Sequence, residues 1–235
     1  RKLDDGGISF SGNMDDVYKV NYLSSTGMVL WLEICDLNVR NEQSIYETIK
    51  KNNWDELFKR ESTFSFKCIQ KGDRFKNTHF LSLKGKDAIV DYFTDKGLQR
   101  PNVEKQDADF NFLILIDNHK GKLLLNTSGR ALYKRGYRTI RHDAPLNETV
   151  ASCILKSIEW KAETPLYDPF CGSGTIPIEA ARIAKNVPSG YNRKKWGFEK
   201  LPEFNKTNWL SIKETADSKI DESVKLNIYG SDNDN

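Results

Sequence analysis

The residues best placed to do chemistry lie in one short string, DPFCGSGT, at positions 168–175. Asp168 follows two apolar residues, as an acid at the end of a short buried strand would. Gly172 and Gly174 permit a sharp backbone turn and a close approach to a ligand, because glycine has no Cβ. Thr175 is expected to be the N-cap of a helix. The free N–H groups and positive end of that helix predict binding of an anionic group.

Three classes of ligand bind glycine turns of this kind. A P-loop needs Gly-Lys-Ser/Thr after the glycines, and none follows here. A nicotinamide cofactor favours a third glycine, where Pro177 stands, and an acid about 20 residues further on. S-adenosylmethionine has a carboxylate for the helix N-terminus, an ammonium and a sulfonium for Asp168, and a ribose diol for a later acid such as Asp232. A glycine turn with a purely structural role is the alternative to all three.

The elements around this string have the order helix, strand, turn, helix, strand. Apolar residues at helical spacing predict a helix that starts at Asn147 or Thr149. A second strand is expected at 227–230, and this order favours a parallel sheet whose ligands bind beyond the carboxyl ends of the strands. The stretch 186–226 is too long for an ordinary loop, so it is expected to be an insertion with structure of its own.

The first 126 residues alternate irregularly between predicted strands and helices. Expected strands lie at 8–10, 29–34, 63–70, 111–116 and 122–126, with the last two paired across a turn at 119–121. Expected helices begin at Asp15–Asp16 and at a Ser44–Glu47 capping box, and a third spans 87–93. This order is typical of an α+β module.

Composition sets limits on the class of protein. The net charge is only +3, with 38% hydrophobic and 29% charged residues in 235. The four cysteines show no C-x-x-C spacing and the histidines are scattered, so we expect neither a metal site nor disulfides, and a cytoplasmic location. Cys171 has no histidine nearby in sequence and is expected to fill space. No membrane span or signal peptide is visible, and the initial Arg1 predicts a fragment.

A basic stretch precedes the glycine string. Between 119 and 143 there are seven Lys or Arg residues and one acid, with two tyrosines among them. Cations bind phosphates and aromatic rings stack on unpaired bases, which predicts RNA binding. The residues expected to bind RNA are Arg130, Lys134, Arg135, Tyr137, Arg138 and Arg141. A solvated charged linker is the alternative, and 193–196 (RKKW) forms a weaker second patch.

The string DPFCGSGT resembles motif I of Rossmann-like RNA methyltransferases, and more narrowly that of the THUMP-domain guanine-N2 methyltransferases. Four more segments resemble that family in its order: GGISFSGNMDDVYKVNYLSSTG (6–27), KGKDAIVDYF (84–93), LLLNTSGRALYKRGYR (123–138) and APLNETVA (144–151). The resemblance implies a ferredoxin-like part at 1–40, a THUMP RNA-binding domain at 41–128, a basic linker at 129–143, and a Rossmann-like methyltransferase domain at 144–235 that contains the insertion 186–226.

The resemblance also implies S-adenosylmethionine as the cofactor and methyl transfer to N2 of guanosine, with 23S rRNA as the favoured substrate. The cofactor contacts that it implies are Asp168, Phe170, Gly172, Gly174, Thr175, Asp232, Asp234, Leu146 and Glu148. Asp168 would lie near the methionine end, and Asp232 would accept hydrogen bonds from the ribose. The family commonly has a hydrophobic residue and a proline where Asn233 and Asn235 stand, which leaves the register of this acid open.

The family's catalytic motif, Asn/Asp-Pro-Pro-aromatic, does not occur in this sequence. No residue of this chain is therefore expected to be catalytic. Two alternatives are a tRNA guanine-N2 methyltransferase and a non-catalytic RNA-binding or assembly factor. A nicotinamide-dependent dehydrogenase is a more distant third.

Overall fold

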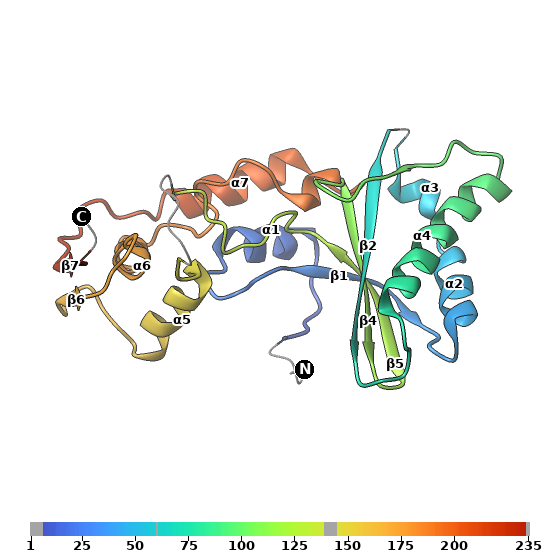
Figure 1. The fold of residues 1–235 in the computed structure, drawn as a ribbon. Coiled ribbons are helices and arrows are strands. Elements are labelled where there is room, and N and C mark those ends of the chain that lie inside the picture. Colours follow the sequence, from blue (N-terminus) through green and yellow to red (C-terminus); the bar gives the residue numbers. More distant parts are fainter. Residues whose placement is uncertain (1–6, 60, 139–144, 234–235) are drawn as a thin grey trace. The chain divides into compact units, whose positions relative to one another are not determined.

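The computed structural model describes residues 7–59, 61–138 and 145–233 (Figure 1). The chain divides into two compact units, and neither is continuous in sequence. Unit 1 holds the chain up to Leu30, Arg130–Lys194 and the stretch from Asn205 onward, and unit 2 holds Trp31–Gly129 and Lys195–Phe204. The division into compact units falls at Leu30, because the first strand pairs with the sheet of unit 2, whereas the domain boundary expected from the sequence lies at residue 40.

Unit 2 is a five-stranded mixed sheet with three helices on one side (Figure 1). The strands, in sheet order, are β1 (Trp31–Leu37), β5 (Lys120–Asn126), β4 (Phe110–Asp117), β2 (Thr63–Lys71) and β3 (Asn102–Val103). The helices are α2 (Glu42–Lys50), α3 (Trp54–Leu57) and α4 (Thr78–Asp95). A short 3-10 helix, η1 (Gly197–Lys200), also belongs to this unit.

The predicted hairpin is present in unit 2. Strands β4 and β5 pair antiparallel, with Phe112 opposite Leu125, and β2 runs parallel to β4 on its other side. The turn lies at 118–119, one step before the expected 119–121, because Asn118 adopts the left-handed conformation with φ 53°. Asparagine is among the residues that tolerate this conformation best.

Aromatic side chains form the core of unit 2. The predicted alternation along β2 places Phe64 and Phe66 opposite Phe110 and Phe112 of β4. The rings of Phe66 and Phe112 stack with centroids 5.0 Å apart, and Phe58 makes edge contacts with Phe64 and Phe110 at 5.4 and 5.1 Å. Such pairs add about 0.5–1.5 kcal/mol each beyond the burial of their area.

Five of the described α-helices start at an asparagine whose side chain accepts a backbone N–H of the first turn: Asn13, Asn41, Asn77, Asn147 and Asn205. The expected Ser44–Glu47 capping box is therefore wrong, since Asn41 accepts the N–H of Ser44 at 2.8 Å. The expected strand at 8–10 is reduced to a single bridge at Ile8. Helix α4 starts well before the predicted 87–93, at Thr78.

Unit 1 carries the glycine turn. Its elements are α1 (Met14–Leu23), α5 (Glu148–Ser157), β6 (Leu166–Asp168), α6 (Thr175–Ala184), α7 (Lys206–Asp217) and β7 (Ile228–Gly230). The two strands pair in parallel, as predicted, with Tyr167 opposite Tyr229.

The expected insertion is folded. Its helix α7 packs against α1, where the ring of Trp209 lies 5.3 Å from that of Tyr22, and the hydroxyl of Tyr22 donates to Asp217 at 2.5 Å. These contacts bring residues from the two ends of the chain into one core. No helix of the part that the structure describes is long and apolar enough to cross a membrane.

Candidate functional site

The glycine turn connects β6 to α6 and is hydrogen-bonded to the residues that follow β7. Gly172 has φ 50° and Gly174 has φ 77°, so both use backbone conformations that favour glycine. The N–H of Gly172 donates to the carboxylate of Asp232 at 2.7 Å, and the N–H of Ser231 donates to the carbonyl of Asp168 at 2.9 Å. Of the two acids predicted from the sequence, Asp168 is the last residue of β6, and Asp232 follows β7 and bonds to the glycine turn.

The loop between β6 and α6 leaves space for a ligand. A Cβ built at Gly172 would meet no atom within 4 Å, so this backbone faces open space. The carboxylate of Asp168 accepts the N–H of Phe170 at 3.2 Å, which holds the start of the loop. The Phe170 side chain is 86% exposed. An exposed aromatic ring beside an open backbone turn is available for contact with a bound molecule.

Thr175 does not cap helix α6. The N-cap is Gly174, and Thr175 is the first helical residue, with its side chain buried. Its hydroxyl accepts a hydrogen bond from Nη2 of Arg138 at 3.0 Å. The first N–H groups of α6 therefore have no side-chain cap, which leaves them available to an anionic group.

The start of α5 is the second part of the site. Asn147 is its N-cap and accepts the N–H groups of Thr149 and Val150 at 2.8 and 3.4 Å, which settles the predicted start. The carbonyl of Leu146 accepts from Nη2 of Arg138 at 3.1 Å. Glu148 is buried and forms an ion pair with the same nitrogen at 3.4 Å. These predicted cofactor residues thus share one partner.

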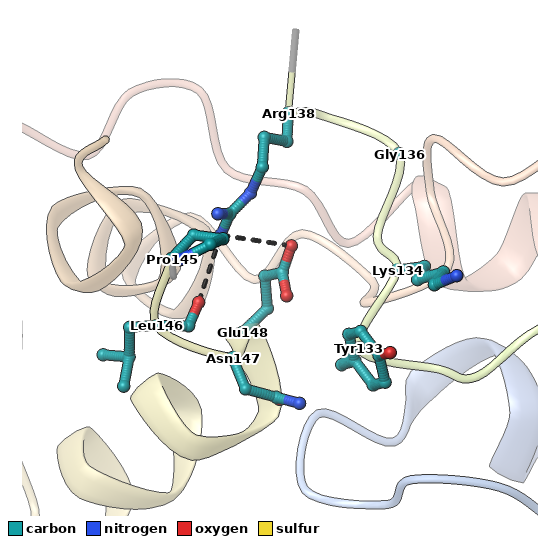
Figure 2. Close-up of a pocket in the computed structure, with 8 residues that line it drawn as sticks. All are labelled: Tyr133, Lys134, Gly136, Arg138, Pro145, Leu146, Asn147 and Glu148. Carbon is teal, nitrogen blue, oxygen red and sulfur yellow. Dashed lines mark hydrogen bonds and ion pairs between the residues drawn. The ribbon is translucent and has the colours of Figure 1, made fainter. Parts of the chain in front are cut away.

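A pocket of about 500 Å³ opens beside them (Figure 2). Its lining combines residues 133–138 with residues 145–148: Tyr133, Lys134, Gly136, Arg138, Pro145, Leu146, Asn147 and Glu148. Gly136 and Pro145 were not expected at the site from the sequence. The glycine at 136 was the one feature of the sequence that could have indicated this part of the site. In the structure Gly136 has φ 90°, and its missing Cβ leaves room for the carbonyl of Asn192.

Several basic residues predicted to bind RNA point into the protein. Arg135 is 0% exposed, and it donates to the carbonyls of Leu132 and Ser25 at 2.8 and 2.6 Å. Its Nε lies 3.6 Å from Glu179 of α6. A side chain without exposed surface does not contact a phosphate, so the assignment of Arg135 to RNA is wrong.

The second patch, 193–196, is also turned inward in part. Arg193 donates to the carbonyls of Ala131 and Arg130 at 2.7 and 2.9 Å, and burial lowers its pKa to about 10. Trp196 is buried, so it offers no ring for stacking on a base. Both side chains were expected at an RNA-binding surface, but in the structure they contact neighbouring parts of the protein.

The remaining predicted RNA residues divide into three groups. Arg130 and Lys134 are exposed and remain candidates for phosphate contact. Tyr137 lies under the guanidinium of Arg182, 5.5 Å from ring centre to carbon, and burial followed by the charge of Glu179 raises its pKa. Arg141, together with Asp234 of the cofactor set, lies outside the described residues.

Cys171 lies within the glycine turn. Its Sγ is 3.0 Å from the position that a Cβ on Gly230 would take, and its N–H donates to the carbonyl of Ser231 at 2.9 Å. The thiol therefore packs against β7, which favours a space-filling role. Among the residues that the structure describes, no group of three or more His, Cys, Asp or Glu side chains is arranged to hold a metal ion.

Comparisons with known proteins match both halves of the chain. A model described as "RMKL-like, methyltransferase domain" matches residues 135–235, and the THUMP domain model matches residues 39–125. The chain belongs to the THUMP-containing, RMKL-like methyltransferase family. The family and the fold class predicted from the sequence are confirmed.

Individual relatives support the same assignment. The "Ribosomal RNA large subunit methyltransferase K/L" of Psychromonas ingrahamii is 37% identical over 230 residues, which cover 97% of this chain and 31% of that protein. Two solved structures have a TM-score of 0.82 and 25% identity over 95% of this chain: a predicted N6-adenine-specific DNA methylase from Listeria monocytogenes, and SMU.472, a methyltransferase candidate complexed with SAH. The chain spans 58% and 59% of these two.

Proposed function

We propose that the protein is an S-adenosylmethionine-dependent RNA methyltransferase that methylates N2 of guanosine, with 23S rRNA as the favoured substrate. One observation carries this proposal: the open glycine turn places Asp168 and Asp232 together at the ends of two parallel strands, beside an uncapped helix start. Ligands of open parallel sheets bind at this edge. The THUMP match and the ribosomal RNA relative support RNA as the substrate.

The residues of the turn fit the parts of S-adenosylmethionine. The uncapped N–H groups at the start of α6 suit its carboxylate, since a helix N-terminus favours an anion. Asp168 suits its cationic ammonium and sulfonium. The carboxylate of Asp232 has one oxygen on the N–H of Gly172 and suits the ribose hydroxyls, because an ionised carboxylate accepts several hydrogen bonds. The open space at Gly172 admits the cofactor beside the backbone.

The reaction follows from the chemistry of the two substrates. When bound, S-adenosylmethionine supplies a methyl group made electrophilic by its sulfonium. This methyl group would pass to the amine of guanine, with the sulfur leaving as a thioether and one proton released from the amine. The part of this chain is to hold the methyl donor in a fixed position, which lowers the barrier through proximity. The target base has to leave its stack to reach the site.

The second role in the proposal, capture of RNA, belongs to unit 2. It contains the whole of the THUMP match, and we propose that it captures structured RNA through phosphate contacts while unit 1 binds the cofactor. A ribosomal RNA substrate also supports a cytoplasmic location. The two activities are separable by measurement, because one concerns a small molecule and the other concerns RNA.

Titration calorimetry of the full-length protein with S-adenosylmethionine tests the cofactor site. We expect micromolar binding that Asp168→Ala and Asp232→Ala each weaken by about tenfold or more, as for a lost hydrogen bond to a charged group. Asp221→Asn is the matched control, since Asp221 is an exposed acid of unit 1 whose carboxylate accepts hydrogen bonds from the N–H and the hydroxyl of Ser223. Binding of NADH in place of S-adenosylmethionine would contradict the proposal.

Methyl transfer from labelled S-adenosylmethionine identifies the substrate. The full-length protein is incubated with 23S rRNA, tRNA and adenine-containing DNA, and the modified nucleosides are separated by mass spectrometry. We expect N2-methylguanosine from rRNA. The same product from tRNA would change the substrate class, and N6-methyladenine in DNA would follow the name of the Listeria structure. RNA binding without cofactor binding would leave a non-catalytic RNA-binding factor.

A further inference from the structure

Arg138 joins the two helix starts that border the site. Its Nη2 donates to the carbonyl of Leu146 at 3.1 Å and to the hydroxyl of Thr175 at 3.0 Å, and it pairs with Glu148 at 3.4 Å. Leu146 and Glu148 belong to the start of α5, whereas Thr175 is the first residue of α6. Figure 2 shows the guanidinium linked to the carbonyl oxygen of Leu146 and to the carboxylate of Glu148. One planar group thus fixes one helix start against the other.

These contacts leave little of Arg138 for a partner at the surface. Its side chain is 20% exposed, and Nη1 is buried without an acceptor among the described residues. A phosphate would have to displace the carbonyl, the hydroxyl or the carboxylate to pair with Nη2. The partner Glu148 has a side chain that is only 9% exposed. Without Arg138 its charge would be buried without this ion pair, which is unfavourable.

We infer that Arg138 is a positioning residue for the cofactor site: it holds the start of α5 at a fixed distance from the glycine turn and the start of α6, and it does not bind RNA. The inference rests on the proposed function, because it assigns a part in binding S-adenosylmethionine to a residue that the cofactor need not touch. The buried Nη1 donor also needs an acceptor, which ordered water or a ligand can supply.

Arginine has properties for this role that lysine lacks. The guanidinium is planar and presents several donors in a fixed geometry, whereas the lysine ammonium is a single point charge on a flexible chain. Lysine at 138 would keep a charge near Glu148, but its Nζ is one bond closer to the backbone than Nη2, so it would not place a donor where Nη2 bonds both Leu146 and Thr175. Arg138→Lys therefore separates compensation of charge from positioning.

The experiment compares two kinds of binding in the full-length protein. Affinity for S-adenosylhomocysteine is measured by calorimetry, and affinity for 23S rRNA is measured over a series of salt concentrations, for wild type, Arg138→Met, Arg138→Lys and the exposed control Lys134→Met. For Arg138→Met we expect about tenfold weaker binding of S-adenosylhomocysteine, with RNA affinity and its salt dependence unchanged. Arg138→Lys should recover thermal stability but not cofactor affinity. If Lys134 contacts a phosphate, Lys134→Met should lower RNA affinity and reduce the slope of log affinity against log salt concentration by about 1.

Each outcome bears on a different statement. If the wild type does not bind S-adenosylhomocysteine, the proposed function itself fails. If both Arg138 variants bind S-adenosylhomocysteine as tightly as the wild type does, the positioning role is overturned. Loss of RNA affinity with a reduced salt slope in Arg138→Met would instead make Arg138 a phosphate contact. If Arg138→Met does not fold, Arg138→Lys alone decides, through its affinity for S-adenosylhomocysteine relative to wild type.

Discussion

The cores of the two units contain different kinds of side chain. In unit 2 the interior is a cluster of aromatic rings, in which the ring centroid of Phe112 lies 5.0 Å from that of Phe66 and 5.4 Å from that of Trp54. In unit 1 the interior near the site contains charges, with Arg135 and Glu179 exposed by 0% and 2% and separated by 3.6 Å. The first core is stabilised mainly by removal of apolar surface from water, and the second depends on paired polar groups.

This difference fits the roles proposed for the two units. Apolar contacts are weakly directional, so a ring cluster gives stability without fixing any one polar atom. Hydrogen bonds and ion pairs depend on geometry, and a buried charge is tolerated only when its partners are correctly placed. In unit 1 the residues around 135–138 are thereby held against α5 and α6, which border the candidate site. The polar core thus gives positional accuracy at the border of the proposed cofactor site.

The largest expected effect of a single change is in the ring cluster. Phe112→Ala removes a side chain that is 1% exposed and leaves a cavity, so we expect a loss of about 3–5 kcal/mol in the free energy of unfolding of unit 2. Urea denaturation followed by tryptophan fluorescence measures it. Ile69→Ala, at a side chain 56% exposed in the same sheet, is the control with little effect. Equal losses in the two variants would show that the cluster is not the core.

The polar core is tested by removing one charge. Glu179→Gln leaves Arg135 buried without its carboxylate, and we expect a loss of about 3 kcal/mol in the free energy of unfolding of unit 1. Glu222→Gln is the matched control, because Glu222 pairs with Lys185 at 2.5 Å but is 77% exposed, where ion pairs contribute little. If the two variants melt at the same temperature, the buried pair does not stabilise unit 1.

A smaller effect is expected where the insertion meets α1. Tyr22→Phe removes the hydrogen bond to Asp217 and should cost about 1 kcal/mol. Burial, and then this hydrogen bond, raise the pKa of Tyr22 above its ordinary value of 10.0. The unfolded chain therefore loses this proton first, so the contribution is present below pH 10 and decreases as the pH rises further. Chemical denaturation from pH 8 to pH 11 should show a shallower decrease for the variant, and parallel curves would refute this assignment.

The sequence predicted best where neighbours in the chain decide the structure. The strands of the hairpin, the alternation of phenylalanines in β2 and the glycine turn were all recognisable, because periodicity and the absence of a Cβ are local properties. Helix starts were predicted less well. Asn41 and not Ser44 caps α2, since several polar residues nearby could each have supplied the cap, and only the backbone path selects one.

The sequence predicted least well which long charged side chains face the solvent and which face the interior. Seven cations in a short stretch predict a basic surface, yet Arg135 is buried and Arg138 bonds within the site, because Ser25, Glu179 and Thr175 are brought to them from distant parts of the chain. Spacing along the chain contains no information about such partners. The sequence by itself determined the glycine turn, its acids and the apolar periodicity. The tertiary structure alone decided which cations face inward, since burial of a charge depends on partners that only the completed fold brings together.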